Sequence, residues 1–222
     1  MAASYFDVDG TLVRTNLVHP TVYYLLNQAT PLRSLARLGG AILRAPKLGL
    51  AELRDRRTFN EELFRLYEGM TEDRLTLLAD EAFDTVMKPA VYPGARDLVA
   101  SCKARGHEVV ILSGALDFLA ERLRRHLGAD TVIANRLELR GGYATGRLLP
   151  PVVAGPTKAL LLREHARAGG HGLDDCHAFS DSYSDVPMLS VVGHATVVNP
   201  GGQLERLARA HHWPVLHLDR TP

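Results

Sequence analysis

Two carboxylates lie one residue apart in the segment YFDVDGTL at residues 5–12, directly after a short apolar run. If residues 4–7 form a strand, its period of two sends the side chains of Asp7 and Asp9 to the same side of the following turn. Acids this close repel each other unless a cation or a shared proton relieves the repulsion. Such a pair suits acid–base or metal chemistry, although alone it is better explained as a solvated turn before Gly10.

Further polar groups occur at three places where the sequence predicts the end of a strand or the start of a helix. Ser113 and Gly114 follow the apolar run 108–112, and Lys158 begins a predicted helix. The segment SDSYSD at residues 180–185 follows another predicted strand and contributes two acids. Because open α/β sheets place their ligands at strand ends, we expect these groups to meet the acid pair in one site.

Together these groups supply what phosphoryl transfer through an aspartyl-phosphate requires. A phosphate monoester dianion repels a carboxylate nucleophile, so its charge must be neutralised before the carboxylate attacks. Mg²⁺ prefers oxygen ligands, and Asp181 beside Asp7 would hold it. Lys158 would neutralise a phosphate oxygen as a point charge, while Ser113 and the Gly114 amide would donate hydrogen bonds to the transferred group. The residue types therefore predict a magnesium-dependent phosphoryl-transfer enzyme.

The elements that must position this site belong to an α/β chain with a helical insertion. From residue 92 onward, strands and helices alternate in the manner that builds a parallel sheet with crossover helices. Between residues 14 and 88 the apolar positions recur at helical spacing and no strand is predicted. We expect a core domain formed by residues 1–14 and 89–222, and a helical cap domain formed by residues 15–88.

Proline and capping residues set the expected limits of the helices in the cap. Pro31 opens a helix that we expect Pro46 to end, and a separate helix is predicted over residues 51–67. Thr71 is expected to cap the next helix, because two acids follow it in the first turn. In the core, residues 137–146 with their central glycine pair predict a hairpin.

Composition and charge exclude several classes of protein. The 222 residues are 46% hydrophobic and 23% charged, enough to bury a core, and the formal net charge of +1 argues against a nucleic-acid partner. Cys102 and Cys176 form no disulfide framework, and the ten histidines show no metal-binding spacing. Without a leader or a long apolar span, the sequence predicts a cytoplasmic protein.

The ordered motifs resemble those of the haloacid dehalogenase (HAD) superfamily of phosphohydrolases. Its first motif, two aspartates and a threonine at alternate positions, is similar to the stretch from Asp7 to Thr11. Its second is a Ser or Thr after a hydrophobic strand, here Ser113, and its third is a lysine at a helix start, here Lys158. Its fourth, two acids after a strand, is similar to the stretch 180–185. The resemblance implies a Rossmann-like core with helices on both faces of a parallel sheet, and a helical cap.

The resemblance also implies a role for each residue of the site. Asp7 would be the nucleophile and a metal ligand, and Asp9 would protonate the leaving alcohol, activate water and offer its backbone carbonyl to Mg²⁺. Asp181 would complete the metal ligands, while Asp185 would orient Lys158. The phosphate would be bound by Gly10, Thr11, Ser113, Gly114 and Lys158.

Finer features resemble subfamily IB, which includes the phosphoserine phosphatases. In those enzymes a glutamate early in the cap holds the substrate ammonium, and this sequence has Asn16 at the corresponding place. Their cap arginine for the substrate carboxylate would fall near Leu66, with Arg65 beside it. A site that must pair two charges does poorly without either partner, so we expect a substrate other than phosphoserine.

The predicted activity is therefore hydrolysis of a small phosphorylated metabolite through an aspartyl-phosphate. Two alternatives remain open: phosphotransfer to an acceptor alcohol, and a non-catalytic metal-dependent or membrane-surface binding module. The second draws on residues 30–50, which hold Arg33, Arg37, Arg44 and Lys47 without any acid. We favour the solvated face of a cap helix for this segment, and the sequence leaves the oligomeric state open.

Overall fold

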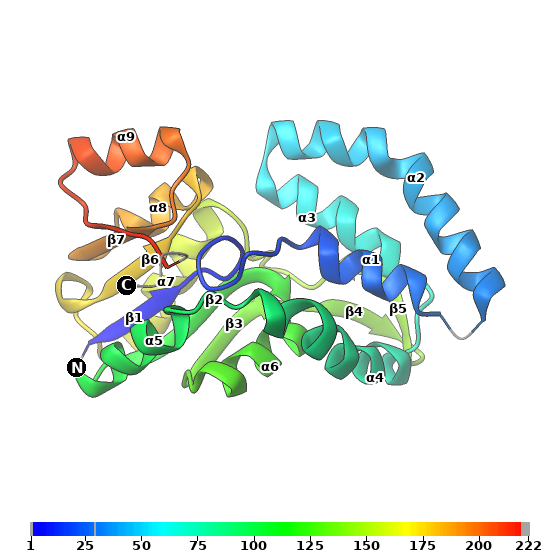
Figure 1. The fold of residues 1–222 in the computed structure, drawn as a ribbon, viewed down its shortest axis with the longest axis horizontal. Coiled ribbons are helices and arrows are strands. Elements are labelled where there is room, and N and C mark those ends of the chain that lie inside the picture. Colours follow the sequence, from blue (N-terminus) through cyan, green and yellow to red (C-terminus); the bar gives the residue numbers. More distant parts are fainter. Residues whose placement is uncertain (1, 29, 219–222) are drawn as a thin grey trace.

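The computed structural model describes residues 2–28 and 30–218, with side chains at all of these positions except 52–54. Six strands form one parallel sheet in the order β3-β2-β1-β6-β7-β8 (Figure 1). The chain crosses from β1 to β2 on one side and to β6 on the other, so β1 lies in the middle of the sheet. The strands are β1 (Ala3–Phe6), β2 (Glu108–Leu116), β3 (Thr131–Asn135), β6 (His177–Ser180), β7 (His194–Val198) and β8 (Val215–Leu216).

Helices cover both faces of this sheet, because its strands are apolar on both sides. Phe6 packs towards one face, where its ring stacks on Phe179 at 4.3 Å between centroids, and Tyr5 packs towards the other. The α/β class with a parallel sheet and helices on both faces is confirmed. The first face is covered by α5 (Ala95–Ala104) and α6 (Asp117–Leu127), and the second by α7 (Pro156–Gly169), α8 (Val186–Leu189) and α9 (Gly202–Ala210).

The segment between β1 and α5 is helical, as predicted, and lies beyond the end of β1 (Figure 1). Its long helices are α1 (Val18–Leu26), α2 (Pro31–Arg54), α3 (Arg56–Phe64) and α4 (Glu72–Ala82). Short helical turns follow at Arg65–Tyr67, Phe83–Met87 and Lys88–Ala90, and in the core at Leu173–Asp175 and Tyr183–Asp185. We call α1 to α4 the cap. Within the part of the chain that the structure describes, no helix is long and apolar enough to cross a membrane.

The expected end of a helix at Pro46 is wrong. Helix α2 runs through Pro46 and ends eight residues later at Arg54. Proline removes one backbone hydrogen bond, which is tolerated here because the surrounding turn of α2 is exposed and water can replace the missing partner. The chain instead breaks at Asp55, whose extended backbone ends α2 and whose carboxylate accepts from the Thr58 amide at 2.8 Å to cap α3.

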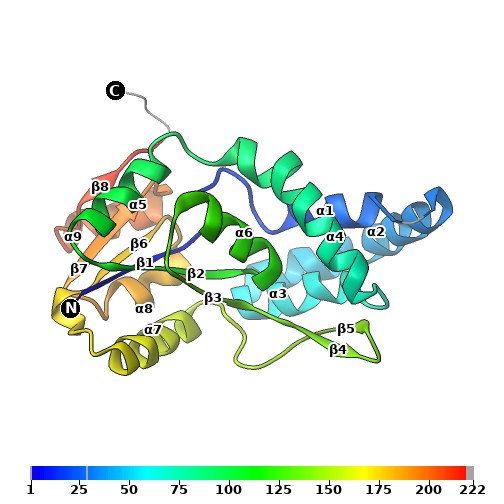
Figure 2. The same ribbon diagram turned by 90° about the horizontal axis from the view of Figure 1, so that it is seen from below.

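The predicted hairpin is present as β4 (Leu137–Arg140) and β5 (Tyr143–Leu148). Although its residues fall in the range expected for the core, the hairpin extends away from the sheet to the cap (Figure 2). The Gly69 amide donates to the Ala144 carbonyl at 2.7 Å, and the Ala144 amide donates to Met70 at 2.8 Å. The hairpin therefore joins the cap to the core.

Candidate active site

The acid pair lies in a tight turn at the carboxyl end of β1. The Asp7 amide donates to the Phe179 carbonyl at 3.0 Å, which fixes this residue between β1 and β6, and its side chain is buried. Gly10 has a φ of +81°, which glycine adopts at little cost. The Gly10 amide donates to Val13 at 2.8 Å. The turn thus brings Asp9 back over the end of the strand, beside Asp7.

Lys158 joins two buried acids from different elements. It lies in the first turn of α7, and its Nζ donates to Asp7 Oδ1 at 2.6 Å and to Asp185 Oδ2 at 2.7 Å. Ser180 Oγ donates to the same Asp185 oxygen at 2.8 Å. Burial alone would lower the pKa of Lys158, but the two carboxylates hold that pKa above its ordinary value. The site therefore keeps a fixed positive charge against Asp7.

Asp181 is positioned by the turn that follows β1. Thr11 Oγ1 donates to Asp181 Oδ1 at 3.1 Å and accepts from the Asp181 amide at 3.0 Å. A Cβ at Gly10 would lie 2.0 Å from Asp181 Oδ2, so only glycine leaves room for this carboxylate. Because the Gly10 amide donates to Val13 and Thr11 is bonded to Asp181, both residues shape the turn and place Asp181. These hydrogen bonds do not test whether Gly10 and Thr11 also contact phosphate, which stays a prediction.

Asp7, Asp9 and Asp181 are buried close together, and their charged forms are disfavoured. Burial, and then the charge of Asp7, raises the pKa of Asp9 to about 8, against a smaller opposing effect of Arg56. The same two causes raise the pKa of Asp181 to about 7, and burial raises that of Asp7 despite the nearby Lys158. A cation bound between Asp7 and Asp181 would relieve this repulsion, and an all-oxygen donor set suits Mg²⁺. The acids present therefore fit the predicted metal.

Ser113 and Gly114 reach the same edge of the sheet from β2. Ser113 is fully buried, and its Oγ accepts from the Ala115 amide at 3.0 Å. Gly114 lines the acid pocket, where a Cβ would lie 2.8 Å from Asn60 Nδ2 and 3.3 Å from the Val153 carbonyl. The structure thus brings the sequence-predicted residues to one end of the sheet, and glycine at position 114 lets the cap approach.

Three residues that the sequence did not single out as site residues line this pocket: Leu17, directly before α1, and Arg56 and Asn60 of the cap. Arg56 and Asn60 lie one turn apart on α3. Asn60 is buried, its Nδ2 donates weakly to Val153 at 3.4 Å, and its Oδ1 has no hydrogen-bond partner among the described residues. The space left inside is about 20 Å³, room for roughly one water molecule. The cap is therefore closed over the acids.

The residues expected from the phosphoserine phosphatase pattern lie elsewhere. The Asn16 side chain accepts from the Val18 amide at 3.0 Å at the start of α1. Arg65 pairs with Glu62 at 2.9 Å and lines a different hollow. The arginine that lines the acid pocket is Arg56, and not Arg65. The helix break at Asp55, which puts Arg56 at the start of α3, could have been found from the Asp-x-x-Thr cap.

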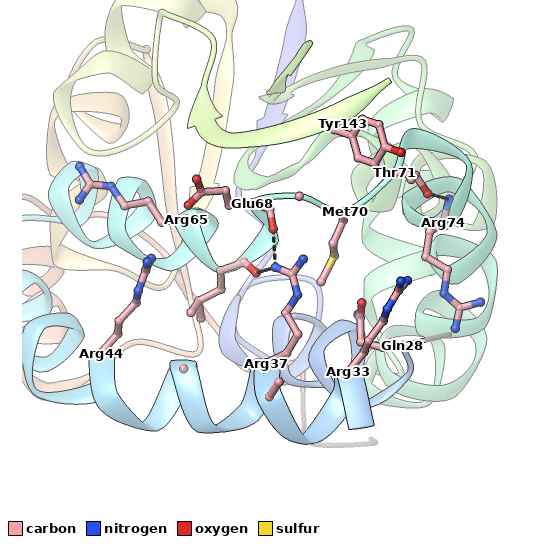
Figure 3. Close-up of a pocket in the computed structure, with 14 residues that line it drawn as sticks. Gln28, Arg33, Arg37, Arg44, Arg65, Glu68, Met70, Thr71, Arg74 and Tyr143 are labelled. Atoms are coloured by element: carbon pink, nitrogen blue, oxygen red, sulfur yellow. Dashed lines mark hydrogen bonds between the residues drawn. The ribbon is translucent and has the colours of Figure 1, made fainter. Parts of the chain in front are cut away.

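The hollow that contains Arg65 has a volume of about 720 Å³ and lies between α2 and the turn after α3 (Figure 3). Arg37 stands at its centre and donates to the backbone carbonyls of Leu66, at 3.2 Å, and Glu68. Four further arginines line it: Arg33, Arg44, Arg65 and Arg74. This arginine pocket lacks a carboxylate pair and cannot carry the predicted chemistry, but it explains where Arg33, Arg37 and Arg44 of α2 point.

Comparison with known proteins identifies the family of this chain. The family model for haloacid dehalogenase-like hydrolases matches residues 5–190. A phosphoserine phosphatase of Mycobacterium tuberculosis is 31% identical over 215 residues, which cover 96% of this chain and 70% of that protein. A Streptomyces azureus protein named for inhibition of morphological differentiation is 31% identical over 224 residues, covering 98% and 79% respectively.

Solved structures share the fold. A Bordetella pertussis protein of unknown function superposes with a TM-score of 0.82 at 23% identity, over 98% of each chain. A phosphoserine phosphatase with an analogue of the phospho-aspartyl intermediate gives 0.70 at 21% identity, over 99% of this chain and 94% of that one. The family resemblance seen in the motifs is confirmed: the chain belongs to the haloacid dehalogenase-like hydrolases and is a phosphatase of that family.

Proposed function

We propose that this enzyme hydrolyses a small phosphomonoester in two steps, with Asp7 as the nucleophile. The observation that carries the proposal is the buried chain of contacts from Asp7 through Lys158 to Asp185, at 2.6 and 2.7 Å. A buried lysine held by two acids is costly as a structural device. It is useful where a dianion must approach a carboxylate, because its charge offsets the repulsion.

In the first step, an Asp7 oxygen attacks phosphorus and the bond to the leaving alcohol breaks. Asp9, which faces the same pocket, gives its proton to the alcohol oxygen. In the second step, Asp9 takes a proton from water as the water attacks the aspartyl-phosphate, which restores Asp7 and releases phosphate. Mg²⁺ held by Asp7, the Asp9 carbonyl and Asp181 would supply charge neutralisation at the transferred group. Lys158 binds a phosphate oxygen throughout, and Asp185 orients it.

The cap residues indicate what kind of leaving group the site accepts. Arg56 and Asn60 both line the acid pocket. Arg56 supplies a positive charge, and Asn60 supplies a carbonyl oxygen that has no partner among the described residues. We infer a leaving alcohol that carries an anionic group and a hydrogen-bond donor. Phosphoserine has both, and the 31% identical mycobacterial relative is named for it. The prediction against phosphoserine therefore rests only on Asn16. An asparagine at this position provides no carboxylate to pair with the ammonium group of phosphoserine.

The test is phosphate release from a panel of phosphomonoesters, with Mg²⁺ or with EDTA. We expect phosphate release in Mg²⁺ from small phosphomonoesters whose alcohol part carries an anionic group, and little release in EDTA. The Asp7→Asn variant, which keeps the size of the side chain, should release no phosphate. Arg56→Gln is expected to raise KM for carboxylated substrates more than for p-nitrophenyl phosphate. A folded Asp7→Asn variant with near-normal turnover would refute the mechanism. New phosphoesters formed when acceptor alcohols are added would favour phosphotransfer.

One observation favours membrane contact as a second candidate function. The face of α2 that points away from the protein carries five large apolar side chains, each 63–85% exposed. No acid occurs in residues 30–50, so this helix would not repel an anionic lipid surface, and the apolar side chains would supply the contact, because Arg33, Arg37 and Arg44 face the arginine pocket. Sedimentation with phosphatidylglycerol vesicles at low salt tests it, with Leu43→Ser as the variant expected to lose binding. The five side chains are those of Leu32, Leu35, Ile42, Leu43 and Leu50.

A further inference from the structure

Three metal-ligating side chains meet at the opposite end of the sheet from the acid pocket. Glu108 begins β2, His165 lies on α7, and His171 lies in the loop after α7. His171 Nε2 is 2.8 Å from Glu108 Oε2, and His165 Nε2 is 3.4 Å from Glu108 Oε1. All three donor atoms lie within 4.8 Å of one another. Two imidazoles thus present the same ring nitrogen to a single carboxylate.

The surroundings of this cluster hold its members in place. Tyr5 Oη lies 3.1 Å from His165 Nδ1, and Thr131 Oγ1 donates to Glu108 Oε1 at 2.7 Å. The His171 side chain is only 5% exposed, against 20% for His165 and 30% for Glu108. The cluster is therefore a partly enclosed site with one side open to solvent, rather than a set of mobile surface groups.

We propose that Glu108, His165 and His171 form a zinc site, with water as the fourth ligand. Two imidazole nitrogens and one carboxylate oxygen are a donor set that zinc accepts in tetrahedral sites. Imidazole ligands disfavour Mg²⁺, which suits the all-oxygen acid pocket instead. The two metals are thus separated by ligand chemistry.

The hydrogen-bond partner of His165 suits the same site. When Nε2 of each ring gives its lone pair to zinc, the ring proton must sit on Nδ1. For His165 that proton meets the Tyr5 hydroxyl, which can turn to accept it. A hydrogen bond of this kind to the second nitrogen of a ligating histidine fixes the ring and raises its basicity. Tyr5 thus has a role as a positioning residue for His165.

The site is expected to act on stability and not on the reaction. Glu108 and Ser113 lie five residues apart along β2, which places zinc roughly 16 Å from the acid pocket. Zinc would link the start of strand β2 to the end of α7, the helix that covers this strand on one face of the sheet. Because the metal binds only the folded chain, it should raise the melting temperature.

The experiment is equilibrium dialysis of the metal-free protein against micromolar zinc, with Mg²⁺ in excess to occupy the acid pocket. The wild-type chain should hold one more zinc ion than His165→Gln or His171→Gln, and each variant should lose at least tenfold in affinity. Tyr5→Phe should lose about tenfold. His194→Gln, which changes an exposed histidine outside the cluster, is the matched control and should bind like wild type.

Two further measurements separate this site from adventitious binding. Nitrogen-15 NMR of the imidazoles should show zinc-dependent shifts in His165 and His171. Gly169→Ala should weaken binding without removing a ligand, because its Cβ would lie 2.6 Å from His171 Nε2. Phosphatase turnover in Mg²⁺ should be unchanged in His165→Gln, which also reports that the variant is folded. Equal zinc stoichiometry in wild type and in folded His165→Gln would overturn the proposal.

Discussion

Gly10→Ala is the substitution for which the structure gives the sharpest expectation. With a φ of +81°, an alanine at this position costs about 1–2 kcal/mol for the left-handed backbone alone. Its Cβ would also lie 2.0 Å from Asp181 Oδ2, where ordinary contacts begin at 3.4 Å. The Asp181 carboxylate must therefore move by more than 1 Å, away from its bond with Thr11. We expect turnover to fall about 10²-fold, the usual effect of such a displacement at a reacting centre.

Gly106→Ala is the matched control, because Gly106 has a φ of +79° and no atom within 4 Å of its added Cβ. Urea unfolding should show a similar backbone cost in both variants, with an extra loss only in Gly10→Ala. Phosphate release, measured over a range of Mg²⁺ concentrations, should be normal in Gly106→Ala and require more Mg²⁺ in Gly10→Ala. If the two variants match in stability and turnover, Gly10 does not position Asp181 and our account of the turn is wrong.

Three other predictions follow from charged groups. Lys158→Met should lower the free energy of unfolding by about 3–5 kcal/mol in urea titrations, because it leaves two buried carboxylates unpaired. Burial lowers the pKa of His177 from 6.5 to about 4, so the unfolded chain binds a proton before the folded chain does as pH falls. The melting temperature should therefore drop between pH 6.5 and 4, and the drop should be smaller in His177→Gln. Tripolyphosphate without divalent metal should raise the melting temperature by filling the arginine pocket. The shift should shrink in Arg33→Gln/Arg44→Gln but not in Arg163→Gln, which changes an exposed arginine of α7 outside the pocket.

The sequence predicts the core well, because its signals there are local. Apolar runs mark the strands, and the polar residues at their ends meet because carboxyl ends of parallel strands share one edge. Asp7 and Ser113 are placed by this rule, whereas Lys158 is placed by the start of helix α7. The end of α2 was mispredicted at Pro46, because this proline lies in an exposed turn where water can replace the lost hydrogen bond.

Residues that act through tertiary contact were beyond the sequence. Asn60 reads as an ordinary helix position until α3 folds back over the acids and leaves its Oδ1 buried without a partner among the described residues. His165 and Glu108 are 57 positions apart in the sequence, so no spacing rule detects their contact. Only the packing of α7 against β2 brings them together. The sequence of the cap likewise does not indicate which of its arginines faces the acids.

The closed cap leads to a last prediction, which concerns Gly114. A hollow of about 20 Å³ cannot admit a phosphorylated metabolite, so the cap must open for substrate and close again for chemistry. Gly114→Ala places a Cβ 2.8 Å from Asn60 Nδ2 and should hold the cap slightly open. We expect kcat to fall about tenfold, because water then enters and the reacting groups are less well aligned.

Shortening the opposing side chain tests whether this contact is the cause. Gly114→Ala/Asn60→Ala restores the space between cap and core, so the double variant should turn over p-nitrophenyl phosphate faster than Gly114→Ala alone. Asn60→Ala by itself removes the proposed substrate contact and gives the baseline rate for that comparison. If the loss of turnover in the double variant equals the product of the fold-losses in the two single variants, the added methyl group acts on the backbone of β2 and not on closure of the cap. A recovery towards the Asn60→Ala rate would instead mean that the fit of α3 over Gly114 sets the closed state.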